Sequence, residues 1–332
     1  MKRIFWLGAC LLPLQLLAQD STMSNLTKEM DASDNEKKIP AKIFISDKVI
    51  NANTTEPIGR GKMDFKVTHN FDDIVANTVY GPPGAHGGIK NFYGLDVTTD
   101  VRIGFALGLT DRLDLILARA KGSSYLDAVK VTNLFEVGFK YQLLRQLEDD
   151  PHHPLAMSFF FSNVISTMDT TRSPTMKFKN TGDRMSQTFQ LIIAKKIGRV
   201  SIQLNPTLVT QGYVQRYDLQ KTMFALGGAI RVPVTRHVNI LVDYFHPFRT
   251  TANEASFKDP AHFSRPVKFS DPLGIGFEII TPGHVFHLNF TNCADILESR
   301  FIPYTVTSWG DGQFRWGFTI SRTFGLWKPK SK

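Results

Sequence analysis

Bulky apolar residues alternate with small or polar ones along much of the chain. In the stretch VRIGFALGL, every second residue from Val101 to Leu109 is large and apolar, and the residues between are Arg, Gly or Ala. Successive side chains of a β-strand point to opposite faces, so a period of two predicts a strand. The pattern stops at Thr110–Arg112 and then resumes, which predicts a hairpin.

The same alternation recurs along most of the chain. No segment with a helical period of useful length competes with it. It predicts about twelve strands, at residues 60–71, 98–109, 113–120, 131–145, 154–167, 186–198, 200–212, 222–234, 237–248, 270–281, 284–293 and 313–326.

The connections between the predicted strands alternate between long and short. In an up-and-down sheet, this order places every long loop at one end and every short turn at the other. Outer-membrane barrels have this asymmetry, with short periplasmic turns, longer outer loops and an even number of strands. The predicted fold is therefore an all-β, membrane-spanning antiparallel up-and-down β-barrel with both termini in the periplasm.

The chemistry of the two strand faces indicates which one meets lipid. One face is bulky and partly aromatic, whereas the other is mostly Gly, Ala, Ser or Thr with a few charges. A soluble core could not pack closely around such small residues with isolated charges. The hydrophobic content of 42% and the mean hydropathy of −0.14 exclude a bundle of membrane-spanning helices but fit a barrel with a polar interior.

Charged residues on the small, polar face are the candidate functional residues. They either pair across the interior and brace or plug the barrel, or line a narrow polar pore that filters solutes. Eight strands leave room only for side chains and sixteen leave an aqueous channel, so twelve lie between these cases. The lumen-facing candidates are Lys62, Asp64, Lys66, Arg102, Asp114, Glu136, Lys140, Arg231, Asp243, Glu278 and Arg315.

The N-terminus is typical of an exported protein. Lys2 and Arg3 precede an apolar run too short to span a bilayer comfortably, which predicts a cleavable signal peptide at 1–18. Its removal leaves Cys293 as the single cysteine of the mature chain. We divide the remainder into a flexible leader at 19–41, an N-terminal segment at 42–59, the barrel at 60–326 and a tail at 327–332. For residues 42–59, the sequence leaves open whether they fold into the lumen as a plug.

Three stretches resemble a known family. These are GLDVTTDVRIGFALGLTDRLDLILARA at 94–120, FKYQLLRQ at 139–146 and INANTTEPIGRGKMDFKVTHNF at 50–71. They are similar to an outer-membrane β-barrel family, domain of unknown function 5777, over about residues 45–326. The resemblance implies a bacterial outer-membrane barrel and implies no activity, ligand or catalytic residue.

Three motifs are candidates for other chemistry. His284 and His287 are three apart and so point to opposite faces of a strand, which disfavours a shared metal ion. The run GPPGAHGG at 81–88 lacks the Lys-Ser/Thr ending of a phosphate loop and is interpreted as an outer loop. His262 and Ser264 have a spacing used by outer-membrane phospholipases, without a recognisable third partner nearby. We therefore expect no metal, no cofactor and no enzymatic activity.

The leading functional hypothesis is a monomeric barrel that passes or binds small polar solutes. One alternative is a non-transporting barrel with a structural or partner-docking role, and another is a lipid hydrolase. The net charge is +9, but the basic residues do not cluster into an arm of the kind that binds nucleic acid. The expected partner is the lipid of the outer membrane.

Overall fold

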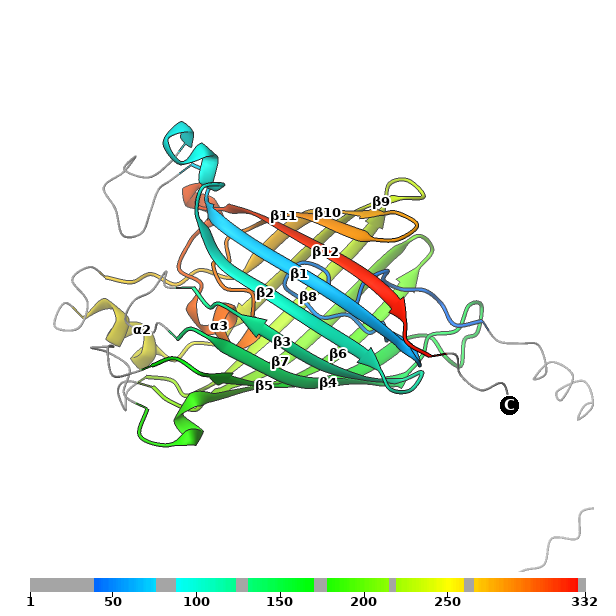
Figure 1. Cartoon of the computed structure of the whole chain (residues 1–332), viewed down its shortest axis with the longest axis horizontal. Coiled ribbons are helices and arrows are strands. Elements are labelled where there is room, and N and C mark those ends of the chain that lie inside the picture. Colours follow the sequence, from blue (N-terminus) through cyan, green and yellow to red (C-terminus); the bar gives the residue numbers. More distant parts are fainter. Residues whose placement is uncertain are drawn as a thin grey trace, which may run out of the picture. The chain divides into compact units, whose positions relative to one another are not determined.

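The computed structural model describes residues 39–75, 88–123, 131–169, 178–214, 219–259 and 266–327. The predicted signal peptide, most of the leader, His262, Ser264 and nearly all of the run 81–88 lie outside these ranges. The described chain forms a closed barrel (Figure 1).

All twelve predicted strands are confirmed. Each is hydrogen-bonded to its neighbours in antiparallel order, and the last strand pairs with the first, so the barrel has no free sheet edge. The strands are β1 (Lys62–Asp73), β2 (Thr98–Gly108), β3 (Leu113–Ala120), β4 (Leu134–Leu144), β5 (Ala156–Ser166), β6 (Met185–Ile197), β7 (Val200–Gln211), β8 (Thr222–Pro233), β9 (Val238–Pro247), β10 (Leu273–Ile280), β11 (Val285–Thr291) and β12 (Arg315–Gly325).

Short and long connections lie at opposite ends of the barrel. We call these ends the turn end and the loop end. The turn end carries connections such as Gly198–Arg199, whereas the loop end carries α2 (Thr251–Lys258), whose first turn is capped by Thr250. Within the described ranges, no helix is long and apolar enough to cross a membrane.

The apolar face of the strands points outward, as predicted. Ile103, Phe105 and Leu204 expose 44%, 41% and 54% of their surface, whereas Ala106 and Ala229, on the other face, are buried. The same alternation runs around the wall, which gives a continuous apolar exterior. A band of this kind suits contact with lipid hydrocarbon.

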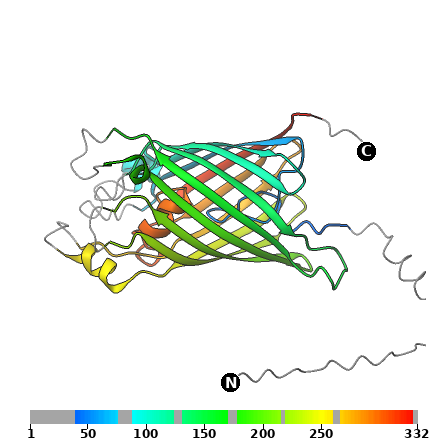
Figure 2. The ribbon, with the colours of Figure 1, turned by 90° about the horizontal axis from the view of Figure 1, so that it is seen from below.

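The interior is filled by two segments that enter from opposite ends (Figures 1 and 2). Residues 43–58, here called the plug, pass into the lumen from the turn end. Residues 292–307, here called the inner loop, fold in from the loop end and carry α3 (Glu298–Tyr304). Nearly every residue of the inner loop is buried. The long connection predicted between the last two strands is therefore present at the loop end, but it folds into the lumen as far as residue 307.

Small residues on the lumen face make room for these two segments. A Cβ atom on Gly274 would lie 2.9 Å from both Asn51 Nδ2 and Ile50 Cγ2 of the plug. Ala156, Ala194, Ala225 and Ala229 belong to the apolar cluster that also contains plug residues. The space beside these Gly and Ala residues of the lumen face is therefore occupied by protein.

Candidate functional site

Asp243, on the lumen face of β9, binds the middle of the plug. Its carboxylate accepts hydrogen bonds from the backbone N–H groups of Ile50, Asn51 and Ala52 and from the Asn51 side chain, at 2.5 to 3.0 Å. Both the carboxylate and its donors are buried. Three consecutive N–H groups converge on one anion, so this wall residue fixes the path of the middle of the plug.

A second contact joins the plug to β10 and β11. Ser46 Oγ donates to Glu278 Oε1 at 3.0 Å and lies 3.2 Å from His287 Nε2. His287 Nε2 is also 3.3 Å from Glu278 Oε1, so serine and carboxylate meet the same ring nitrogen. A catalytic triad needs them on opposite nitrogens, and this cluster therefore acts as a polar anchor.

Wall residues around this anchor interact with the other carboxylate oxygen of Glu278, Oε2. Asn239 Nδ2 donates to Glu278 Oε2 at 2.6 Å, and Arg231 Nε lies 3.7 Å from the same oxygen. Arg231 also reaches the plug through the carbonyl oxygen of Ile43. The charge of Glu278 is therefore paired within a hydrogen-bonded network, as a buried charge requires.

Basic and acidic residues of β1, β3 and β4 hold both flanks of the plug. Lys66 forms an ion pair with Asp47 of the plug and lies 3.6 Å from Asp64. Lys140 donates to the carbonyl oxygen of Glu56 and lies 4.0 Å from Asp114. Asp114 in turn accepts from the N–H of Ile58 at 3.1 Å.

Ten of the eleven sequence-predicted charges lie in the lumen wall, buried or nearly so, and six of them contact the plug directly. Arg102 and Glu136 instead pair with each other, at 2.7 Å. Arg315 pairs with Asp73 at 2.8 Å and donates to Thr307 of the inner loop. Lys62 is exposed at the turn end. The six contacting residues are Lys66, Asp114, Lys140, Arg231, Asp243 and Glu278.

The plug and the inner loop touch each other inside the barrel. Lys48 Nζ donates to Glu298 Oε1 at 2.7 Å, and Asn53 Nδ2 donates to the same oxygen at 3.1 Å. Phe44 and Ile50 of the plug share an apolar cluster with Phe301 of α3. The two segments thus form one packed core within the lumen.

Cys293 is a free, buried thiol of this core. Burial raises its pKa to about 12, and Thr305 Oγ1 lies 3.8 Å from its sulfur. The thiolate is the reactive form of cysteine, so folding protects this thiol.

Two polar cavities flank the plug where it enters at the turn end. Their volumes are about 330 and 240 Å³, and Lys42, Glu56 and Lys62 line both. A third void of about 20 Å³ lies deeper, between Asp47, Lys66 and Glu136. A space of that size holds about one water molecule. This deeper void is therefore too small for a solute, unlike the two entrance cavities.

The plug-side residues of these contacts were not among the sequence-predicted candidates. Ser46, Asp47 and Asn51 stand in the run ISDKVINANTTEP at 45–57, which has no strand alternation. The feature that could have identified this run as a plug is its series of short polar side chains. Such side chains allow the backbone to lie close to the lumen wall. His284 lies just before β11 and His287 is buried in the lumen, so the two do not converge. Among the described residues, no group of three or more His, Cys, Asp or Glu could hold a metal ion.

A family model for a membrane-bound β-barrel domain, domain of unknown function 5777, matches residues 44–324. The chain belongs to this family. The match begins inside the plug and ends in β12, so the plug and the inner loop both lie within the family domain. The resemblance seen in the sequence is confirmed.

Solved outer-membrane barrels are similar in fold at low identity. An outer membrane channel from Pseudomonas putida F1 is 12% identical, with a TM-score of 0.47, over 81% of this chain and 98% of that one. Omp33 of Acinetobacter baumannii is 8% identical, with a TM-score of 0.37, over 79% and 98%. Outer membrane phospholipase A of Escherichia coli is 6% identical, with a TM-score of 0.37, over 80% and 93%. No curated protein matches the chain.

Proposed function

We propose that this protein is a gated channel of the bacterial outer membrane that admits small polar solutes when the plug moves. The turn end then faces the periplasm and the loop end faces the outside. The observation that carries the proposal is the binding of residues 50–52 to the single carboxylate of Asp243.

The polar character of this contact supports a movable plug. Water can replace a hydrogen bond to a carboxylate, and the net contribution of one such bond is only about 1.5–3 kcal/mol. Such bonds can therefore exchange for bonds to water when the lumen is hydrated. The displaced lumen wall would still be polar, with Gln190, Gln203 and Asn205 facing the vacated space.

One observation favours a second candidate, a permanently closed barrel with a structural role. Phe44 and Ile50 pack with Phe301 in one apolar cluster, and exposing that cluster to water is costly. This apolar cluster joins the plug both to the inner loop and to wall residues such as Ala225 and Phe245. The two candidates therefore differ in whether the polar set can open while the barrel stays folded.

Conductance of the refolded full chain in planar bilayers distinguishes the two. We expect rare, small openings for the wild type and a severalfold larger mean current for Asp243→Ala, which removes the acceptor for residues 50–52. Asp243→Asn keeps the shape of the side chain and should give an intermediate current. Glu136→Gln is the control. It changes the charge of a wall residue whose described contact is to Arg102 and not to the plug.

Swelling of liposomes in sugar solutions measures the passage of uncharged solutes. If Asp243→Ala remains a folded barrel and passes neither ions nor sugars, the channel proposal is wrong and the closed barrel is favoured. If Glu136→Gln raises the current as much as Asp243→Ala, the Asp243 contact is not the gate.

A further inference from the structure

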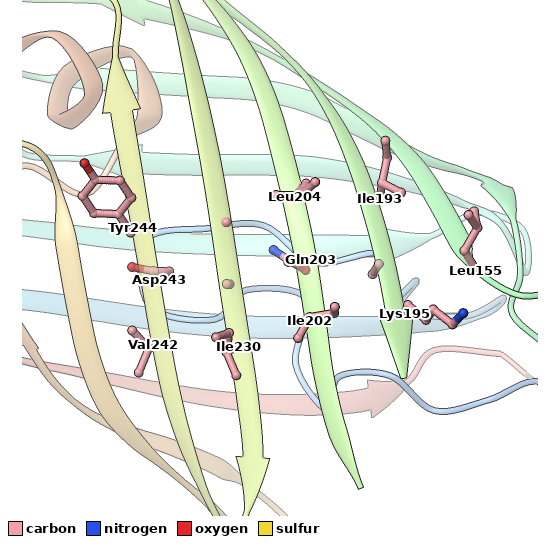
Figure 3. A pocket seen from close by; sticks show the side chains of 13 residues that line it. Leu155, Ile193, Lys195, Ile202, Gln203, Leu204, Ile230, Val242, Asp243 and Tyr244 are labelled. Atoms are coloured by element: carbon pink, nitrogen blue, oxygen red, sulfur yellow. The ribbon is translucent and has the colours of Figure 1, made fainter. Parts of the chain in front are cut away.

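A groove of about 520 Å³ crosses the outer, lipid-facing surface of the barrel (Figure 3). It begins at Leu155, beside the turn end of β5, and reaches Val242 and Tyr244 on β9. Between them, Figure 3 shows Ile193, Ile202, Leu204 and Ile230 along its course. The outward side chains along the groove are apolar apart from the amino group of Lys195 and the hydroxyl of Tyr244.

Gly228 forms the floor of the groove. It lies on the outward face of β8, between Leu204 of β7 and Tyr244 of β9 in the strand register. Outward neighbours on the same strand, Leu226 and Ile230, are exposed and bulky. The missing side chain therefore leaves a depression in an otherwise continuous apolar wall.

The two ends of the groove differ chemically. Tyr244 bounds one end, and its hydroxyl donates to Asp271, which also lies 2.8 Å from His246 Nδ1. Lys195 bounds the other end, close to the turn end of β6. Its amino group is exposed and makes no ion pair with another described residue.

Two further exposed cations lie in connections at the turn end of the barrel. Arg199 follows β6 and Arg236 follows β8, both at the turn end, and both are exposed. A long basic side chain on an apolar wall directs its charge toward the headgroup region of the membrane. The groove thus has an apolar body in the hydrocarbon and a positive end at the membrane surface.

We propose that this groove binds one acyl chain of an anionic phospholipid, with the headgroup phosphate on Lys195. The groove spans strands β5 to β9, and neighbouring strands are about 4.8 Å apart, so its length is about 19 Å. The hydrocarbon core of a bilayer is about 30 Å thick, so one leaflet is about 15 Å. A single chain from the leaflet at the turn end therefore matches the groove in length and polarity.

Native mass spectrometry of the full chain, released from detergent with added lipid, tests this site. The probes are phosphatidylglycerol, which is anionic, and phosphatidylethanolamine with the same acyl chains. We expect the wild type to retain phosphatidylglycerol in preference. Gly228→Leu, which fills the floor, should reduce retention of both lipids severalfold. Lys195→Gln should remove the preference and leave the retention of phosphatidylethanolamine unchanged.

Two matched variants control for general effects on the wall. Arg322→Gln removes an outward cation near the turn end of β12, and Val67→Leu enlarges an outward side chain of β1. Neither should change lipid retention. Equal losses in Gly228→Leu and Val67→Leu would overturn the groove, and equal losses of preference in Lys195→Gln and Arg322→Gln would overturn the headgroup contact. Because the site lies outside the lumen, these results do not depend on whether the plug moves.

Discussion

Lys48 of the plug and Glu298 of the inner loop form an ion pair of 2.7 Å inside the barrel. The two residues are 250 positions apart and belong to segments that enter from opposite ends. Since Glu298 also accepts from Asn53, one carboxylate makes two of the polar contacts between the segments. Displacement of the plug therefore leaves a buried acidic group on the inner loop without its cation.

This pair should be strongly coupled in a double-mutant cycle. Removing one member of a buried ion pair leaves the other charge unpaired, at a cost on the order of 3 kcal/mol. We expect Lys48→Met and Glu298→Gln each to lower the free energy of unfolding by about that amount. The double variant should lose less than the sum of the two single losses. Urea titration of the refolded protein measures all three.

The exposed pair between Glu254 and Lys258 on α2 is a matched control. Its side chains are about half exposed and its atoms lie 3.8 Å apart. A surface pair at this spacing contributes about 0.3–0.5 kcal/mol. Strictly additive losses for Lys48 and Glu298, like those expected on α2, would mean that the buried pair does not couple the two segments.

Gly274→Val should displace the plug and open the lumen. The substitution adds atoms on the lumen face of β10 and leaves the outer face of the barrel unchanged. The added atoms would overlap Ile50 and Asn51 and would also press on Asp243, so the plug could not occupy its present position. We expect a severalfold increase in bilayer current. Gly228→Val is the control, since Gly228 lies on the outer face and its nearest obstacles, at 3.3 and 3.8 Å, belong to β7. Equal currents from both variants would argue against a role for the plug in closure.

The wall of this protein could be predicted from sequence because lipid imposes one rule on every strand. Most outward positions in the hydrocarbon region must be apolar, so alternation such as that from Val101 to Leu109 gives both the strand and its orientation. The inward direction of Asp243 and Glu278 follows from the same parity. Their contacts do not, because Ile50 and Ser46 lie about 190 and 230 residues away in the chain and carry no periodic signal.

The inner loop could not be predicted for a related reason. Its helix α3 has seven residues, contains Pro303 and is buried on all sides, so it shows no amphipathic pattern. Its position depends on space left by small wall residues such as Ala225 and Ala229 and on Phe245, which packs edge-on against Phe301. Those wall residues lie more than 50 positions from α3 in the chain, so no local pattern marks the contact.

Arginine substitutions along β2 test which face meets hydrocarbon. Ile103 is near the middle of the strand and points outward, so Ile103→Arg should lower the free energy of unfolding by about 2–4 kcal/mol. Leu107 also points outward but lies near the turn end, where the cost should fall to about 0–1 kcal/mol. Refolding titrations in lipid vesicles measure the order. A larger loss for Leu107→Arg than for Ile103→Arg would contradict the assigned membrane position.

The reactivity of Cys293 reports whether the inner loop moves when the plug does. Burial raises the thiol pKa to about 12, which lowers the fraction of reactive thiolate at neutral pH. We expect maleimide labelling at pH 8 to be slower in the folded protein than in urea by orders of magnitude, because the sulfur is buried as well as protonated. Labelling should accelerate as pH rises toward 12, since the thiolate then forms without unfolding. Glu298→Gln should accelerate labelling at pH 8, whereas Asp243→Asn should leave it slow if the plug can move alone. Fast labelling in Asp243→Asn would instead mean that plug and inner loop leave together.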